Sequence, residues 1–469
     1  MTAMNPSEQL RDRLEGLLGQ LEDGLIERRR EVRLILLAAL AGEHSLLLGP
    51  PGTAKSELAR RLHLAFSEAR YFERLLTRFS VPEELFGPLS IRALEEDRYE
   101  RHTAGFLPEA SIAFIDEVFK ANSAILNALL TLLNEREFDN GAGRVHCPLI
   151  SAIGASNEVP DDEVAAAFFD RFLLRIPVSP VSGEGFRALL ALPPLDSGGT
   201  IFDGALDAAE RDALARCAAA VALPAEVAER MVELRTWLVA RDIAVSDRRW
   251  VKVAGLLRTA AASEARDAIS PWDLMLLPGC LGRDEAEQQA VRDWLTTRLG
   301  VREACAPPRL ERVVAAFEAQ LLAERNADDL DYDDDGRLRL GDAGIAREVN
   351  DMKGGSQALR MTYTRTRRYG DTHVGARTGQ LDDLLERIAG YREELATVAR
   401  EFAGYRATSL WLDLPLADAI DANLAAIGTA LDTFAARARS CRAGFEALPR
   451  LPDDPGIRPE PVAWEPLRQ

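Results

Sequence analysis

Residues 46–56 constrain the fold of this chain more than any other stretch. They read Leu-Leu-Leu-Gly-Pro-Pro-Gly-Thr-Ala-Lys-Ser, an apolar run that breaks at Gly49 and Pro50 before a helical pattern begins at Lys55. This order predicts a buried strand, a loop and a helix. Backbone N–H groups of the loop and the positive end of the helix dipole then point to one place, which favours an anion.

The stretch fits the phosphate-binding pattern G-x-x-x-x-G-K-[ST], except that Ala54 stands where the second glycine belongs. Alanine still allows a close backbone approach in a helical conformation, but it loses easy access to positive φ. We expect Lys55 to reach the β- and γ-phosphates of a nucleotide and Ser56 to bind Mg²⁺. A plain Gly/Pro turn before a surface lysine is the alternative. The predicted nucleotide-binding residues of this loop are Gly49, Pro50, Pro51, Gly52, Thr53, Ala54, Lys55 and Ser56.

A second apolar run, residues 112–115, ends in the carboxylates Asp116 and Glu117. Parallel sheets bury such strands on both faces, so residues at the carboxyl end of the strand lie in the crevice where ligands bind. Asp116 is therefore predicted to bind Mg²⁺ and the nucleotide, and Glu117 to act as the general base for an attacking water. The alternative is a strand that merely ends in a charged turn.

Three more polar positions are candidates. Asn157 ends a further apolar strand and can hydrogen-bond the attacking water or the γ-phosphate, although it also suits an ordinary turn. Arg171 precedes the last short strand, and by itself it would be a surface charge. Ser246 is a plausible N-cap, and Arg248 and Arg249 lie in the first turn of the helix that follows. Arginines there oppose the helix dipole, so a bound anion would explain their position.

Composition excludes some classes of protein. The 469 residues allow about three domains, and the net charge of −18 argues against nucleic acid as the main partner. No apolar run approaches the length of a membrane span, and the polar start lacks a signal-peptide core, so we expect a cytoplasmic protein. The cysteines are widely spaced and odd in number, which favours buried reduced thiols over metal or disulfide sites.

The order of the predicted elements divides the chain. Strands and helices alternate over residues 1–180, and helices alone follow over 181–300. A discontinuous helical stalk is expected at 301–327 and 381–448, interrupted by a variable insertion at 328–380. The proline-rich residues 449–469 are expected to form a loose tail.

The insertion contains two patterns of weak specificity. Residues 331–336 obey the first half of a calcium-loop pattern, but Asp342 stands at the twelfth position and Arg339 at the ninth, so a solvated acidic turn is favoured. Residues 360–369 interleave basic and aromatic side chains. They could bind RNA or an acidic partner, but a solvated insertion is the preferred interpretation.

Together these motifs resemble the AAA+ ATPases, and within them the MoxR family and its RavA (regulatory ATPase variant A) group. The stretches that carry the resemblance are 49–56, 79–91, 115–136 and 245–250, and it covers residues 27–281 well. It implies an α/β AAA+ core with a parallel sheet flanked by helices, an α-helical lid, and a further long-helix bundle with an inserted irregular segment.

The resemblance also implies roles for single residues. Asn157 matches sensor 1, and Arg171 matches the arginine finger that reaches the nucleotide of the next subunit. Arg248 is the preferred sensor 2, with Arg249 as its rival. The segment 79–106 would hold the helix-2 insert, and the Asn140-Gly141 turn would form the pre-sensor-1 hairpin. A finger supplied in trans implies a ring, typically a hexamer.

The function implied by the family is Mg²⁺-dependent ATP hydrolysis by a chaperone-like remodeller or activator. Family partners carry von Willebrand factor A (vWA) domains, and in the RavA group a β-rich module in the stalk recruits a client. Residues 328–380 occupy that place here but show little strand alternation. A DNA-directed motor of the same clade and a nucleotide-gated scaffold are the alternatives; the acidic charge argues against the first, and the intact Asp116-Glu117 pair against the second.

Overall fold

The computed structural model describes residues 6–141, 143–160, 163–192, 204–301, 307–330 and 364–463. The calcium-type sequence at 331–336 and the start of the basic, aromatic stretch at 360–369 lie outside these ranges. The chain divides into two compact units. The first comprises residues 1–299 and 404–419, and the second comprises residues 300–403 and 420–469.

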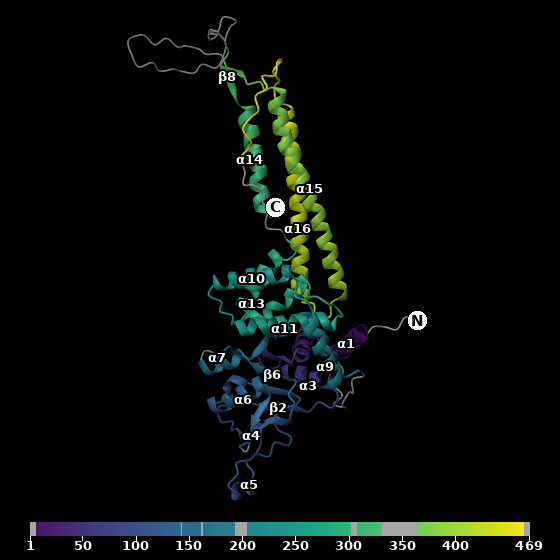
Figure 1. Ribbon diagram of the computed structural model, residues 1–469, viewed down its shortest axis with the longest axis vertical. Coiled ribbons are helices and arrows are strands. Elements are labelled where there is room, and N and C mark those ends of the chain that lie inside the picture. Colours follow the sequence, from purple (N-terminus) through teal and green to yellow (C-terminus); the bar gives the residue numbers. More distant parts are fainter. Residues whose placement is uncertain are drawn as a thin grey trace, which may run out of the picture. The chain divides into compact units, whose positions relative to one another are not determined.

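A five-stranded parallel sheet forms the centre of the first unit, with the order β2-β3-β6-β1-β7 (Figure 1). The strands are β1 (His44–Leu48), β2 (Tyr71–Leu75), β3 (Ile112–Asp116), β6 (Ser151–Ser156) and β7 (Phe172–Pro177). The sequence pattern also favours a short strand near residues 74–78, and the observed β2 begins three residues earlier. The central strands are almost fully buried, as expected when helices cover both faces of a parallel sheet. Because the strands are parallel, the loops after β1, β3 and β6 open at the same edge.

Amphipathic helices pack on this sheet. α2 contacts β1 and β7, and α3 contacts β3. The buried leucines of α6 belong to the same hydrophobic core as Ala113 and Ile115 of β3. The helices of this layer are α1 (Pro6–Glu22), α2 (Arg29–Leu40), α3 (Lys55–Leu64), the one-turn η2 (Val118–Lys120), α6 (Ser123–Glu135) and α7 (Glu163–Phe169).

Two short excursions leave the sheet. The segment between β2 and β3 forms α4 (Glu83–Phe86), α5 (Ile91–Glu95) and η1 (Leu107–Glu109). β4 (Glu137–Asp139) and β5 (Arg144–His146) pair antiparallel around the predicted Asn140-Gly141 turn. Gly141 has φ 80°, and a Cβ there would lie 2.1 Å from the Tyr99 carbonyl oxygen, so the close approach of the two excursions requires glycine.

The remainder of the first unit is helical. Its elements are α8 (Gly183–Ala191), α9 (Ala208–Ala220), α10 (Ala225–Val239), α11 (Asp247–Ser263), η3 (Pro271–Leu276), α12 (Leu277–Leu281) and α13 (Glu285–Arg298). Ser246 caps α11 as predicted, because its side chain accepts a hydrogen bond from the backbone N–H of Arg249. The predicted fold class, an α/β core followed by a helical lid and a long-helix bundle, is confirmed.

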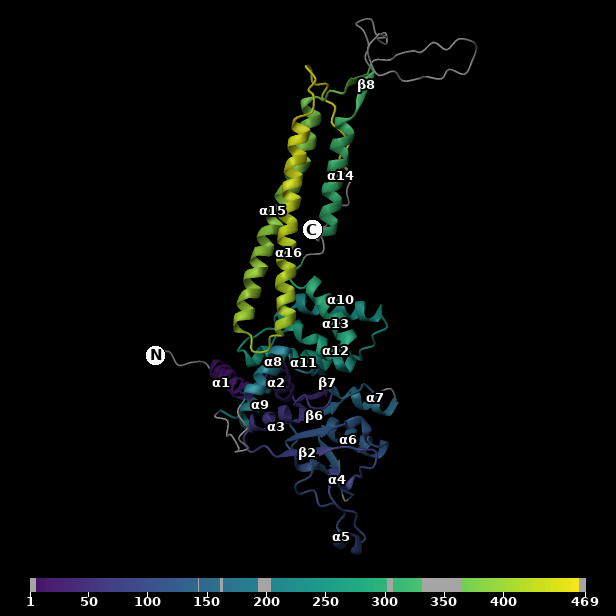
Figure 2. The same ribbon diagram turned by 180° about the vertical axis from the view of Figure 1, so that it is seen from behind.

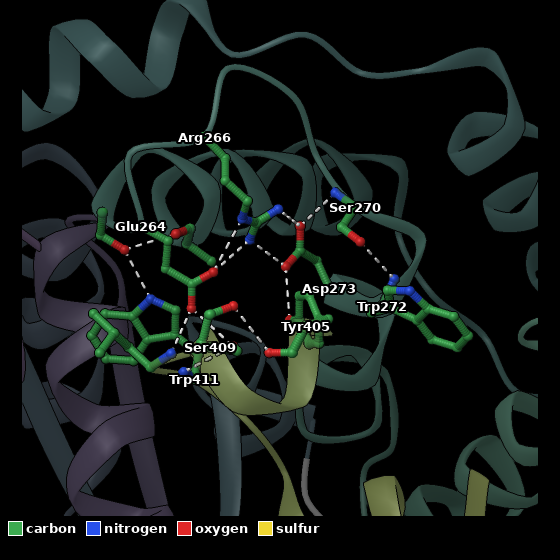
Figure 3. A network of polar contacts seen from close by, with 12 residues as sticks. Glu264, Arg266, Ser270, Trp272, Asp273, Tyr405, Ser409 and Trp411 are labelled. Atoms are coloured by element: carbon green, nitrogen blue, oxygen red, sulfur yellow. Dashed lines mark hydrogen bonds and ion pairs between the residues drawn. The ribbon is translucent and has the colours of Figure 1, made fainter. Parts of the chain in front are cut away.

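Residues 404–419 comprise the end of one long helix, a turn and the start of the next. They belong to the first unit, and a polar network connects them to it (Figure 3). Tyr405 donates its hydroxyl to Asp273 at 3.0 Å, and Arg266 lies between the carboxylates of Asp273 and Glu264. Glu264 in turn accepts hydrogen bonds from the Ser409 hydroxyl at 2.8 Å and the Leu410 N–H at 2.6 Å. The turn is therefore anchored at the end of α11 by charged groups that are each paired.

In the described residues of the second unit, long helices run side by side in both ribbon views (Figures 1 and 2). They are α14 (Pro307–Arg325), α15 (Asp371–Thr408) and α16 (Leu414–Glu446), and a short antiparallel pair, β8 (Asp328–Leu330) and β9 (Thr364–Thr366), leaves the end of α14. α15 begins at Asp371, inside the segment that the sequence predicted to be an irregular insertion. Glu324 of α14 accepts a hydrogen bond from Arg377 of α15 at 2.9 Å, so the start of α15 is held by a buried ion pair.

The expectation of a loose C-terminal tail does not hold for its described part. The Leu451 N–H donates to the Tyr369 carbonyl at 3.0 Å, and the Asp454 carboxylate accepts the Thr372 N–H at 2.7 Å. Arg377 also donates to the Glu460 carbonyl at 2.7 Å. Proline content predicted the lack of helix here, but not these contacts with the start of α15.

Among the described residues, one helix, α16, is long and apolar enough to cross a membrane by length and composition alone, with a mean hydropathy of 1.2 in its most apolar window. This is weak evidence, because a core helix meets the same criterion. Leu431, Ala438 and Phe445 of α16 are completely buried, as in such a core helix.

Candidate functional site

The loop between β1 and α3 is shaped by two residues. A Cβ at Gly49 would lie 2.1 Å from the Val178 carbonyl oxygen, so glycine is required where the loop leaves the sheet. Ala54, directly before α3, has φ 66° and ψ 24°. The sequence predicts that alanine loses easy access to this left-handed region, but Ala54 adopts it. The conformation costs an L-residue about 1–2 kcal/mol, so the surrounding structure must hold the loop against strain.

Lys55 lies almost completely buried at the start of α3, with 8% of its surface exposed. Its ammonium group donates to the carbonyl oxygens of Gly49 at 2.5 Å and Pro50 at 3.0 Å, and to Oδ1 of Asn157 at 3.3 Å. Burial lowers the pKa of Lys55, and the nearby carboxylates of Asp116 and Glu117 oppose that shift. The cation is thus placed inside the loop, where phosphates are predicted to bind.

The two carboxylates at the end of β3 are arranged differently. Asp116 accepts the backbone N–H of Glu117 at 3.0 Å. Glu117 has φ 51°, and its carboxylate accepts a hydrogen bond from Nδ2 of Asn157 at 2.8 Å and lies 3.1 Å from Nζ of Lys120. The side-chain amide of Asn157, after β6, therefore contacts both Lys55, after β1, and Glu117, after β3.

A cavity of about 530 Å³ opens beside this chain of contacts. Glu117 and Asn157 contribute to its wall, together with the basic side chains of Arg78 and Lys120. The cluster of Lys55, Asp116, Glu117 and Asn157 thus lies at the carboxyl edge of the sheet, and two of its members line a cavity whose wall also holds Arg78, Lys120 and Glu158.

Arg171 and Arg248 form a separate pair. Arg171 follows α7, and its buried Nε has no hydrogen-bond partner in the described part of the chain. Burial and the neighbouring charge of Arg248 lower the pKa of Arg171, opposed by Asp170. Arg248 is exposed and donates to Oδ1 of Asn134 at 3.2 Å. In the described residues neither arginine contacts Lys55, Glu117 or Asn157.

Arg249 has a different environment from its neighbour Arg248. It is buried, with 4% exposed surface, and donates to the carbonyl oxygens of Phe172 and Leu173, both at 2.8 Å, and to that of Cys280 at 2.5 Å. Its guanidinium also lies 3.0 Å from the Asp170 carboxylate. These contacts occupy the donors of Arg249 and fix the backbone on both sides of Arg171. Of the two residues predicted as candidates for sensor 2, Arg249 is buried among backbone carbonyls and Arg248 is exposed.

Comparisons with known proteins agree on the family. Residues 12–194 match the MoxR domain of MoxR-vWA-beta-propeller ternary systems, and residues 226–295 match the AAA lid domain. An uncharacterized protein of Methanocaldococcus jannaschii is 40% identical over 56% of this chain and 70% of its own length. Protein MoxR of Paracoccus denitrificans is 27% identical over 36% of this chain and 51% of its own length. The chain belongs to the MoxR family of AAA+ ATPases.

A solved structure supports the fold alone. A putative ATPase from Cytophaga hutchinsonii matches with a TM-score of 0.50 and 16% identity, over 62% of this chain and 94% of that one. Membership of the MoxR family implies nucleotide binding, and the edge of the sheet fits that ligand, because it offers a buried ammonium and helix N–H groups.

The metal expected with a nucleotide also fits the residues present. No group of three His, Cys, Asp or Glu side chains in the described ranges is arranged to hold a metal ion on its own. Mg²⁺ does not need one, since it binds through one or two protein oxygens together with phosphates and water. The Ser56 hydroxyl in the first turn of α3 and the Asp116 carboxylate at the end of β3 are oxygen ligands of that kind.

One residue of this MoxR-family site was missed. Three adjacent arginines such as Arg28, Arg29 and Arg30 usually form a solvated face, and Arg29 fits this pattern, because its side chain is 58% exposed. Arg28 is 6% exposed and donates from Nε to the Thr53 carbonyl oxygen of the loop at 3.2 Å. No sequence signal could reveal this contact, because a backbone carbonyl accepts it and any residue type has one.

Proposed function

We propose that this MoxR-family protein hydrolyses ATP with Mg²⁺ and uses the energy to remodel or activate a protein complex. The observation that carries the hydrolytic part is the Asn157 amide, which contacts both Lys55 and Glu117. It links the cation that would bind the β- and γ-phosphates to the carboxylate that would deprotonate water. These are the two groups that phosphoryl transfer to water requires at one place.

Each residue then has a task. Lys55 exchanges its contacts with the Gly49 and Pro50 carbonyls for phosphate oxygens. Glu117 accepts the proton of the attacking water, and Asn157 orients that water or the γ-phosphate. Ser56 and Asp116 would hold Mg²⁺, which when bound neutralises charge on the phosphate oxygens.

We further propose that Arg171 completes the site of a neighbouring copy, so that the working form is a ring, typically a hexamer. The Nε of Arg171 lacks a partner in the described chain, and the side chain stands apart from Lys55 and Glu117. An arginine positioned this way can stabilise the transition-state charge of a second subunit. Arg248, close enough to affect its pKa, would contact the same nucleotide as sensor 2.

For the partner we propose a cytoplasmic protein with a vWA domain, because the matching MoxR family is described from MoxR-vWA-beta-propeller systems. The long helices interrupted between α14 and α15 suggest the RavA group in particular. The net charge of −18 disfavours a DNA-directed motor.

The full-length protein should hydrolyse ATP with Mg²⁺ and lose that activity in EDTA. For the partner, the Glu117→Gln variant serves as bait with ATP, because a ring that binds but does not turn over should retain its client. The same bait with ADP is the control. Absence of Mg²⁺-dependent hydrolysis at any protein concentration contradicts the enzymatic proposal, and equal capture with ATP and ADP contradicts the remodelling proposal.

A further inference from the structure

The loop between β1 and α3 contains one residue, Ala54, in a strained backbone conformation. Its methyl side chain cannot form a hydrogen bond that would stabilise this conformation. Ala54 is the N-terminal capping residue of α3 and is left-handed, and it makes no side-chain hydrogen bond to the helix. The phosphate-binding pattern has glycine here, for which the same backbone conformation costs little. Some other group must therefore keep residue 54 in place.

The peptide bond between Thr53 and Ala54 shows what holds it. This unit is planar, so the direction of the Thr53 carbonyl fixes the opposite direction of the Ala54 N–H. The Thr53 oxygen accepts a hydrogen bond from Nε of Arg28 at 3.2 Å. The Ala54 N–H consequently points away from Arg28. In a loop of this type that N–H is one of the groups that bind phosphate.

Arg28 is itself fixed from two sides. One terminal nitrogen donates to the Ser179 carbonyl after β7 at 2.8 Å, and the other to the Glu27 carbonyl before α2 at 2.8 Å. The Glu27 carboxylate accepts the Ser182 N–H at 2.7 Å, which ties the same two segments together. The structure gives Arg28 no ion pair with a carboxylate among the described residues. Its rigid fork meets only carbonyls, and a lysine could not reproduce that geometry.

We propose that Arg28 is a positioning residue for phosphate binding, which keeps the loop in its binding shape while alanine occupies position 54. The inference rests on the proposed nucleotide site. Arg28 does not touch the nucleotide in this scheme and acts through the Thr53-Ala54 peptide. It follows that Arg28 matters less when residue 54 is glycine, because glycine adopts the left-handed conformation without support.

The experiment is a double-mutant cycle in the full-length protein, with the affinity for Mg²⁺ and fluorescent ADP as the readout. Arg28→Gln should weaken ADP binding by about tenfold, the equivalent of one buried hydrogen bond and its anchors. In the Ala54→Gly background the same change should cost about threefold or less. The inhibition constant of adenosine, which lacks phosphates, should be the same for the wild type and the Arg28→Gln variant when it is corrected for the affinity of each protein for fluorescent ADP.

Two further variants define the result. Arg28→Lys keeps the charge but loses the fork, and it should weaken ADP binding nearly as much as Arg28→Gln; it also serves if Arg28→Gln does not fold. Arg29→Gln, in the exposed neighbour, should bind ADP like the wild type. Equal losses in the wild-type and Ala54→Gly backgrounds, or normal ADP affinity of Arg28→Lys, would overturn the inference. Failure of the wild-type protein to bind ADP would instead refute the proposed nucleotide site.

Discussion

The carboxyl edge of the sheet and the segment around Arg171 differ in how their functional side chains are satisfied. At the edge, the side-chain amide of Asn157 contacts both Lys55 and Glu117. Around Arg171, the functional guanidinium has a buried Nε without a partner in the described chain and a like charge, Arg248, beside it. In the first region the functional candidates are linked by hydrogen bonds, whereas in the second the Asp170 carboxylate pairs with Arg249 and Arg175 and the Nε of Arg171 has no partner in the described chain. This difference favours an arrangement in which the anion that meets Arg171 belongs to another copy.

The two regions share one device. A buried arginine lies behind each functional loop and donates to backbone carbonyls: Arg28 to Thr53, and Arg249 to Phe172 and Leu173. The difference is that Arg249 also contacts the Asp170 carboxylate, which lies 3.5 Å from Arg175 as well. The segment around Arg171 is therefore held by an ionic cluster, and the loop between β1 and α3 by neutral acceptors.

The largest effect is expected when Arg171 is replaced, because this tests whether the residue acts on the nucleotide of another copy. Arg171→Ala should leave ATP binding nearly intact but slow hydrolysis by about 10³-fold, the lower end of what arginine fingers contribute. Mixing it with the Glu117→Gln variant, itself nearly inactive, should restore activity, because interfaces then combine an intact Arg171 with an intact Glu117. Steady-state phosphate release measures both. No recovery on mixing would show that Arg171 does not act in trans.

The ionic support of the segment around Arg171 can be tested through stability. Arg249→Met should lower the free energy of unfolding of the first unit by about 3 kcal/mol, because it leaves several buried carbonyls unpaired and removes one of the two arginines beside the Asp170 carboxylate. Arg248→Met, one residue earlier and exposed, should change it by less than about 0.5 kcal/mol. Urea unfolding followed by tryptophan fluorescence reports on this unit, which contains Trp237, Trp272 and Trp294. Equal stabilities of the two variants would contradict the structural role of Arg249.

Whether a site residue can be found from the sequence depends on how far apart in the chain its contact partners lie. Asp116, Glu117 and Asn157 could be found because each follows an apolar strand, and the ends of parallel strands meet at one edge. Arg28 could not, because its acceptors lie 25 and 151 residues away and are carbonyls. The same holds for Arg249, whose carbonyl acceptors Leu173 and Phe172 lie 76 and 77 residues away.

Local propensity also failed where tertiary contacts outweigh it. The first turns of α15 contain Gly375 and Gly379, poor helix formers, so this stretch was assigned to the insertion. The ion pair of Arg377 with Glu324 and the contacts of the C-terminal segment hold it as helix. At Ala54, similarly, the sequence indicated only what alanine disfavours, and the fold imposes that conformation.

Returning to the edge of the sheet, Glu117→Gln should bind ATP but turn over about a hundredfold more slowly, because the attacking water loses its base. The glutamine oxygen can still accept the Asn157 amide, so the contacts at the edge remain and only the chemistry changes. Fluorescent ATP binding and single-turnover hydrolysis separate the two effects. Wild-type turnover of this variant would show that Glu117 is not the general base. The proposed contrast between the edge of the sheet and the segment around Arg171 would then no longer hold.

The smallest effect is expected at Ala54, in the loop that Arg28 supports through neutral carbonyl acceptors. Ala54→Gly removes the left-handed strain but adds backbone freedom to the unfolded chain, and the first term is the larger. We therefore expect the first unit to gain about 0.5–1 kcal/mol in free energy of unfolding, measured by urea titration. Gly52→Ala, at φ 80° two residues earlier, is the reciprocal control and should lose stability. A loss at position 54 would mean that alanine is not strained there, and Arg28 would then have nothing to hold.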